Sequence, residues 1–229
     1  MTASHEANPV ALWLNTLGIS SFVVHYRVAP YTNTYGPMQD AARAIRHARA
    51  SAEELQLDVN RIGVLGFSAG GHLAGSISNH YDEGNESSDD ATERLSSRPD
   101  LSILIYPVIS FKPEYVHQGS MDNLIGTAHD PALVEKFSLE TQVTPNTPPT
   151  FLVHSADDNS VPFENSLIYA MALRKANVPV EMHIFEAGGH GYGLGGDDPI
   201  LSTWPALCAL WLARHNFAAN SAPFSILTL

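Results

Sequence analysis

The stretch Arg61-Ile62-Gly63-Val64-Leu65-Gly66-Phe67-Ser68-Ala69-Gly70-Gly71-His72-Leu73-Ala74 combines an aliphatic run with a serine between two glycines. The aliphatic part, residues 61–67, predicts a buried strand, and the residues behind the serine predict a helix over 70–79. Flanking glycines let the backbone turn sharply between these elements, so that the hydroxyl of Ser68 stands exposed above the sheet. In such a turn the backbone amide of Ala69 points at an incoming oxyanion. The stretch therefore predicts a strand, a turn and a helix that present a nucleophile.

Further aliphatic and β-branched runs recur along the chain, with helix-like stretches between them. Strands that alternate with helices form right-handed crossovers, so this order predicts an α/β fold with a mostly parallel sheet and helices on both faces. A length of 229 residues favours one domain, 1–229, with an insertion around 107–149. The expected strands are residues 21–27, 61–67, 101–106, 150–154 and 180–185, and the expected helices are residues 8–18, 38–55, 70–79, 163–176 and 204–215.

The composition is that of a globular protein with a strong excess of acidic residues. Twelve Lys and Arg stand against 24 Asp and Glu, a net charge of −12, so the chain lacks the basic field that nucleic acid or an anionic membrane attracts. No apolar stretch reaches the roughly 18 residues of a membrane span. We therefore expect neither nucleic acid nor a membrane as a partner.

Two further features bear on compartment and metal binding. The single cysteine, Cys208, forms no intramolecular disulfide and rules out a metal site built from cysteines. Residues 1–7 lack the basic region and apolar core of a secretory signal, so we expect a cytoplasmic protein, although a missing front of the chain could carry such a signal.

Two later segments supply partners for a nucleophilic serine. Asp157 and Asp158 follow the expected strand at 150–154, and His190 lies between glycines behind the last expected strand. The carboxyl ends of parallel strands meet at one edge of the sheet, where these side chains would join Ser68. The chain order Ser, Asp, His is that of the α/β-hydrolase arrangement, with either aspartate as the carboxylate.

Over most of its length the sequence resembles the acetyl-esterase and hormone-sensitive-lipase-like carboxylesterases of the α/β-hydrolase superfamily. The matching segments are Tyr26-Arg27-Val28-Ala29-Pro30, residues 61–74, Tyr106-Pro107-Val108-Ile109, residues 158–162 and Gly189-His190-Gly191.

This resemblance implies a role for each residue of the site. Ser68 would be the nucleophile, His190 the general base and then the general acid, and Asp158 the carboxylate that orients His190. Asp158 is preferred to Asp157 because the family's acid stands three residues before a Val-Pro pair, here Val161-Pro162. The amide of Ala69 would be one oxyanion donor, and the reaction would need no metal and no organic cofactor.

The members of the family most similar to this chain are often assigned to short acyl esters, including acetyl groups on plant polysaccharides. The resemblance thus implies a serine carboxylesterase that hydrolyses short-chain, acetyl-type esters of small molecules through an acyl-enzyme. The alternative is an esterase-like binding protein with impaired catalysis, because residues 1–7 contain no counterpart of the family's His-Gly-Gly-Gly-type oxyanion loop. A peptidase of the superfamily is disfavoured, since no gating domain precedes the hydrolase segment.

The first expected strand corresponds to the fourth strand of the family, which predicts an N-terminally truncated fold. Because the family's third strand lies between its fourth and fifth, the strands at residues 21–27 and 61–67 would either pair directly after a shift or leave two unpaired edges. We therefore expect a homo-oligomer. The apolar tail, residues 224–229, is β-prone. It would either be donated to the sheet of a partner or remain a frayed terminus.

Several other side chains fit structural roles better than catalytic ones. We expect packing for His25, Tyr26, His72 and His183, and burial for Cys208 on an apolar helix. Residues 81–99, crowded with Asp, Glu, Ser and Asn, predict a solvated loop. The insertion at 107–149 either shapes a substrate pocket or is a surface excursion, and the sequence leaves both open.

Overall fold

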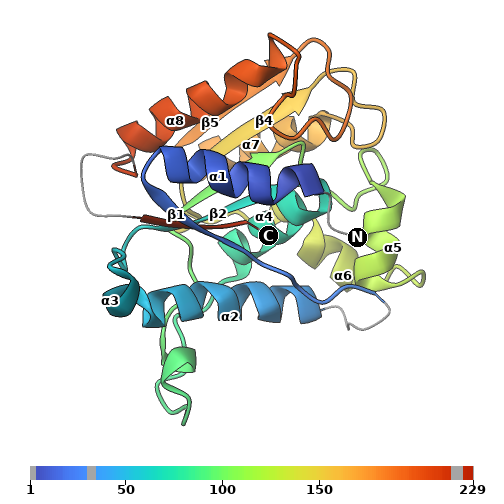
Figure 1. Ribbon diagram of the computed structural model, residues 1–229. Helices are drawn as coiled ribbons and strands as arrows, with labels where there is room; N and C mark the ends of the chain where they lie inside the picture. The colour runs from blue at the N-terminus through green and yellow to red at the C-terminus, as the bar shows by residue number, and fades with distance from the viewer. Residues whose placement is uncertain (1–3, 30–34, 218–223, 229) are drawn as a thin grey trace.

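The computed structural model describes residues 4–29, 35–217 and 224–228. A sheet of six strands runs through the molecule in the order β1-β6-β2-β3-β4-β5 (Figure 1), and every neighbouring pair is parallel. The strands are β1 (Ile19–Val23), β2 (Ile62–Phe67), β3 (Leu101–Ile105), β4 (Thr150–Ser155), β5 (Val180–Phe185) and β6 (Phe224–Thr228). The parallel sheet confirms the predicted α/β fold.

Helices cover both faces of the sheet (Figure 1). On one face lie α1 (Asn8–Thr16) and α8 (Trp204–Arg214), which share an apolar core with the sheet. On the other face lie α2 (Gly36–Ala50), α4 (Ser68–His80) and α7 (Glu164–Lys175). No helix in the described ranges has both the length and the hydropathy that crossing a membrane requires.

The strand sequences explain why both faces are covered. Successive side chains of a strand point to opposite faces, and in β2 Leu65 packs toward α1 and α8 while Val64 packs toward α4. Both side chains are fully buried, and burying an aliphatic side chain of this size contributes about 1.5–3 kcal/mol. Apolar residues at consecutive positions therefore stabilise a strand that lies between two layers of helix.

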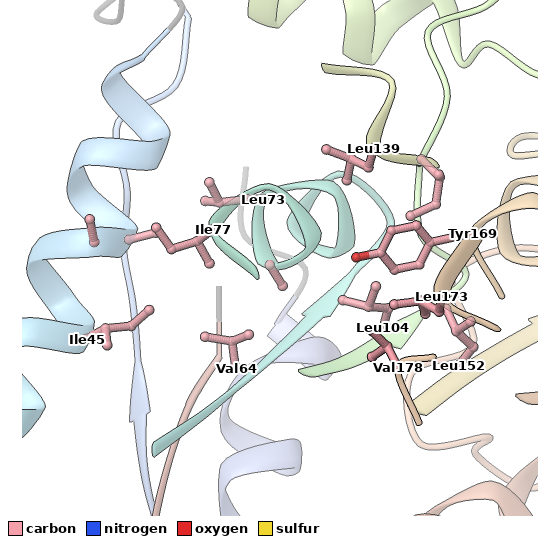
Figure 2. Close-up of a cluster of buried hydrophobic side chains, with 14 of the residues drawn as sticks. Ile45, Val64, Leu73, Ile77, Leu104, Leu139, Leu152, Tyr169, Leu173 and Val178 are labelled. Carbon is pink, nitrogen blue, oxygen red and sulfur yellow. The ribbon is translucent and has the colours of Figure 1, made fainter. Parts of the chain in front are cut away.

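Figure 2 shows the core under α4, the helix that follows the nucleophile turn. Leu73 and Ile77 of α4 lie in one buried cluster with Ile45 of α2 and Tyr169 of α7. This packing fixes α4 against the sheet and thereby fixes the serine at its first residue. The other labelled members of the cluster are Val64, Leu104, Leu139, Leu152, Leu173 and Val178.

The C-terminal strand β6 lies between β1 and β2, where the sequence led us to expect either a gap or direct pairing of these two strands. Its residues pair in parallel with both neighbours, from Ile19 opposite Phe224 on one side and from Ile62 opposite Ser225 on the other. Both expectations for this tail, donation to a partner's sheet and a frayed terminus, are therefore wrong for Phe224–Thr228. The tail completes the sheet of its own chain. Homo-oligomerisation stays a prediction, but unpaired strand edges no longer support it.

Two elements differ most from the expectation. The helix expected over 38–55 is divided, because α2 ends at Ala50 and a short α3 (Ala52–Leu55) follows Ser51. The first strand begins earlier and ends earlier than 21–27. Arg27, at the end of the expected strand, instead forms an ion pair with Asp40 of α2 at 2.8 Å.

The insertion at 107–149 contains α5 (Gln118–Ile125) and α6 (Pro131–Phe137). The two helices have a small core of their own, in which Phe111, Met121 and Phe137 are buried. The insertion is therefore a packed element beside the carboxyl ends of the strands. The acidic segment at 81–99 is held to α2 at several points, for example by Arg46, which donates to Leu95 O at 2.9 Å.

Candidate active site

Ser68 occupies the sharp turn between β2 and α4 that the glycine pattern predicts. Its φ of +52° is a left-handed conformation that is uncommon for a residue with a side chain. The turn requires glycine at position 66, because a Cβ there would lie 2.1 Å from Gly70 O. Strained backbone of this kind persists where surrounding structure enforces it, often at functional sites.

His190 connects this serine to a carboxylate. Its Nε2 lies 2.8 Å from Ser68 Oγ, and its Nδ1 lies 2.6 Å from Asp158 Oδ2. A carboxylate only accepts hydrogen bonds, so Nδ1 carries the proton and Nε2 accepts from the serine hydroxyl. The structure thus brings together the three side chains singled out from the sequence, from the ends of β2, β4 and β5.

Asp157, the other candidate carboxylate, makes a different contact. Its Oδ1 accepts from Gly189 N at 2.8 Å, at an exposed position. It therefore holds the loop that carries His190 but does not bind the imidazole. The geometry favours Asp158 as the partner of His190.

The side chain of Asp158 is fully buried and has its hydrogen-bonding capacity filled. Oδ1 accepts from Ser160 N at 2.8 Å and from Val161 N at 2.9 Å, while Oδ2 faces His190 and His154. Burial alone would raise the pKa of this carboxyl, but the hydrogen bonds from the two histidines and two backbone amides hold its pKa well below the usual value. Asp158 is thus kept ionised beside His190.

His154, on β4, is a second histidine on Asp158 that the sequence analysis missed. Its Nε2 lies 3.2 Å from Asp158 Oδ2 and 3.0 Å from Val161 O, so this nitrogen carries the proton. Its Nδ1 accepts from Ser166 Oγ at 2.8 Å. The available signal was a polar residue at the end of an aliphatic strand, four positions before the aspartate.

Ala69 lies in the first turn of α4, directly behind the nucleophile. Backbone N–H groups at this end of a helix have no acceptor within the helix, and the helix dipole favours negative charge there. Ala69 is exposed. It therefore offers an amide of the kind that an oxyanion hole uses, as the sequence pattern predicts.

Ala69 is among the residues that line a cavity of about 170 Å³ between α2, α4 and α5. Its walls are mostly apolar, with Met38 of α2, Leu73 of α4 and Leu124 of α5 among them. Phe111, from the insertion, also lines it. Of the two interpretations of the insertion, the structure supports the one in which it shapes a pocket.

His72 forms part of the wall of this cavity and is structural, as expected. It stacks on Phe111 with ring centroids 4.7 Å apart and an interplanar angle of 5°, and its Nε2 donates to Phe137 O at 2.9 Å. Burial lowers the pKa of His72 to about 4, so the ring is neutral at physiological pH.

The other residues that we expected to have structural roles agree with the structure in part. His25 is exposed, which contradicts the expected packing, because β1 ends before it at Val23. Tyr26 is partly buried, packs against the apolar core as expected, and also lines the cavity. His183 is structural and contacts Glu181 Oε1 at 3.0 Å, and Cys208 is fully buried. Within the described part of the chain, no group of three or more His, Cys, Asp and Glu side chains could hold a metal ion.

Comparison with known proteins places this geometry in a family. Residues 6–173 match the family model BD-FAE. The acetyl ester-xyloside bifunctional hydrolase from Caldicellulosiruptor lactoaceticus, known as a crystal structure, is 51% identical with a TM-score of 0.92, over 95% of this chain and 79% of that one.

Two curated relatives match by sequence. The acetylxylan esterase of Xylanibacter ruminicola is 34% identical over 85% of this chain, and the endo-1,4-beta-xylanase B of Butyrivibrio fibrisolvens is 34% identical over 89%. The chain spans only 39% and 32% of the length of these two relatives. With a family model that covers most of its length, the chain belongs to the BD-FAE family and is an α/β-hydrolase-fold relative of the carboxylesterases.

Proposed function

We propose that this protein is a serine carboxylesterase that hydrolyses short-chain, acetyl-type esters. The observation that carries the proposal is the continuous hydrogen-bonded chain from Ser68 Oγ through His190 to the buried, ionised Asp158. This arrangement activates a hydroxyl for attack on a carbonyl carbon, and Ala69 supplies an amide next to the position where negative charge would develop.

The reaction proceeds in two halves. Ser68 Oγ attacks the ester carbonyl while His190 Nε2 takes its proton, and the oxyanion that forms is stabilised by the amide of Ala69. The bond to the alcohol then breaks as His190 returns the proton to the leaving oxygen. A water molecule, deprotonated by His190, then attacks the acyl-enzyme. The bond to Ser68 Oγ breaks as His190 gives this proton to Oγ, and the acid leaves.

Two observations support a small acyl group on a carbohydrate alcohol. The cavity next to Ala69 is small and mostly apolar, which suits a short acyl chain better than a long one. Two of the relatives that match over most of this chain are named as an acetylxylan esterase and an acetyl ester-xyloside bifunctional hydrolase. These names give no support to the alternative of an inactive binding protein.

The proposal is tested with chromogenic esters of increasing acyl length and with acetylated xylo-oligosaccharides. We expect kcat/KM to be highest for the acetyl ester and to fall with each longer acyl group, and we expect free acetate from the oligosaccharide. The Ser68→Ala variant is the matched control for hydrolysis by contaminants. Absence of hydrolysis above that variant would overturn the assignment as an esterase, whereas a preference for octanoyl esters would overturn only the acyl specificity.

A further inference from the structure

The segment that carries His190 has little rigidity of its own. No helix or strand lies between the end of β5 at Phe185 and the 3-10 helix that begins at Leu201. Glycines flank His190 in left-handed conformations, with φ of +60° at Gly189, +83° at Gly191 and +55° at Gly193. Glycine loses more conformational freedom on folding than any other residue, so contacts from elsewhere must hold this loop.

The N-terminal 3-10 turn Ser4–Glu6 supplies two such contacts. His5 Nε2 donates to Gly191 O at 2.9 Å. Glu6 Oε1 accepts from the hydroxyl of Tyr106 at 2.7 Å, and the same hydroxyl accepts from Gly193 N at 3.0 Å. The turn thus holds the loop on both sides of residue 192. His5 binds Gly191 directly, and Glu6 binds Gly193 through the hydroxyl of Tyr106.

The turn and the loop also pack closely. A Cβ at Gly193 would lie 2.9 Å from His5 Cδ2, so a side chain there would have to displace the His5 ring. On its other side the loop is anchored by Trp204 Nε1, which donates to Gly193 O at 3.0 Å. Gly193 therefore has both of its backbone polar groups bound by buried aromatic side chains, Tyr106 and Trp204.

Tyr106 links this contact to the imidazole itself. Its side chain is fully buried, and its ring centroid lies 4.8 Å from that of His190. Burial and the negative charge of Glu6 raise the pKa of Tyr106, so the hydroxyl keeps its proton and donates it to Glu6. With its proton directed at Glu6, the hydroxyl presents a lone pair to Gly193 N. A shift of Tyr106 would move the loop and the face against which His190 rests.

We infer that the turn Ser4–Glu6 is a clamp on the catalytic loop, in which Glu6 acts through Tyr106 as a positioning residue for His190. Glu6 touches neither the substrate nor the reacting atoms. The inference rests on the proposed function, since it assigns His190 as the general base. It predicts that loss of the Glu6 carboxylate displaces the imidazole and slows acyl transfer without weakening substrate binding.

The test compares Glu6→Ala with Glu6→Gln in the full chain, using p-nitrophenyl acetate and counting active sites with a fluorophosphonate. A misplacement of about 1 Å costs roughly 10²-fold in rate, and the loop keeps its other anchors, so we expect about a tenfold loss of kcat per active site in Glu6→Ala. KM should stay within about twofold. Glu6→Gln keeps an acceptor for Tyr106 and should recover to within about threefold of the parent. The control is Glu54→Ala, at an exposed carboxylate on α3.

A second comparison separates action through Tyr106 from a general effect on folding. In a Tyr106→Phe background, Glu6→Ala should have no further effect on kcat, because the hydroxyl that connects the two is absent. A full additional tenfold loss in that background would overturn the relay. A Glu6→Ala protein that turns over at the parent rate per active site would overturn the clamp itself.

A spectroscopic readout keeps this test independent of turnover. We expect the proton on His190 Nδ1, which is bound to Asp158, to give a downfield NMR resonance that His190→Ala identifies by its loss. We expect this resonance to shift or broaden in Glu6→Ala and to stay in place in Glu54→Ala. If the parent protein shows the resonance but hydrolyses no ester, the proposed function is wrong, and the NMR comparison with Glu6→Ala still tests the clamp. An unchanged resonance in Glu6→Ala contradicts the clamp.

Discussion

Replacing Asp158 by asparagine tests the geometry of the site, because the outcome is determined by the hydrogen bonds around one carboxylate. Oδ1 accepts from Ser160 N and Val161 N, so the amide oxygen of an asparagine must take this position. The amide nitrogen then takes the position of Oδ2, opposite His190 Nδ1. The new group donates where the carboxylate accepted.

This exchange reverses the tautomer of His190. Nδ1 must now accept, so the proton moves to Nε2, where it faces Ser68 Oγ and prevents the ring from acting as a base. In serine hydrolases the loss from a wrong tautomer is about 10⁴ in kcat. The same amide also faces the proton on His154 Nε2, which then donates to Val161 O alone.

The matched control is Asp157→Asn. Gly189 N needs only an acceptor at that position, and an asparagine oxygen provides it, so we expect a loss of kcat well under tenfold. Both variants are assayed with p-nitrophenyl acetate, and urea unfolding reports their stability. Equal losses of kcat in the two variants, or a loss below tenfold in Asp158→Asn, would refute the assignment of the carboxylate.

Two further predictions concern stability. Burial lowers the pKa of His72 to about 4 from an ordinary value near 6.5, so the unfolded chain takes up the proton first as the pH falls. The free energy of unfolding, measured by urea unfolding, should therefore drop by on the order of 3 kcal/mol between about pH 6.5 and 4. A His72→Phe variant with the same steep drop would contradict this. A chain that ends at Ala222 loses β6 and exposes the facing edges of β1 and β2. Light scattering should therefore show stronger self-association in the truncated chain than in the full chain, which we also predict to be a homo-oligomer. A truncated chain that is monomeric and as stable as the full chain would show that β6 is dispensable.

The parts of the structure that the sequence predicted are those with a local cause. The strand at 61–67 follows from consecutive aliphatic residues, and the turn at Ser68 follows from the glycines on either side of it. Parallel strands also bring the residues at their carboxyl ends to one edge, so that Ser68, His190 and the pair Asp157 and Asp158 could be placed together from the sequence. The choice of Asp158 over Asp157 came from the family resemblance.

The position of β6 has a non-local cause. Its apolar residues made a short strand one of two expectations, beside a frayed terminus, and local pattern does not specify which neighbours a strand pairs with. The deciding factor is that β1 and β2 each offer an unpaired edge whose backbone groups need partners. Pairing with strands more than a hundred residues away satisfies both edges at once.

The second layer of the site was missed for a related reason. His154 is visible in the sequence only as a polar residue in an apolar strand, and its contact with Asp158 depends on the turn that follows β4. The bond from Tyr106 to Glu6 joins residues a hundred positions apart, and neither spacing nor composition indicates it. Supporting residues of this kind have no motif of their own and are found from geometry.

The most direct test of the account is covalent trapping of the nucleophile. The protein is incubated with a fluorophosphonate, digested and analysed by mass spectrometry, while hydrolysis of p-nitrophenyl acetate is followed in the same sample. We predict one adduct per chain on Ser68, loss of activity in proportion to labelling, and a Ser68→Ala variant that takes no label and loses about 10⁶ in kcat. Labelling at another residue, or acetyl-ester hydrolysis by Ser68→Ala at the parent rate, would contradict the account.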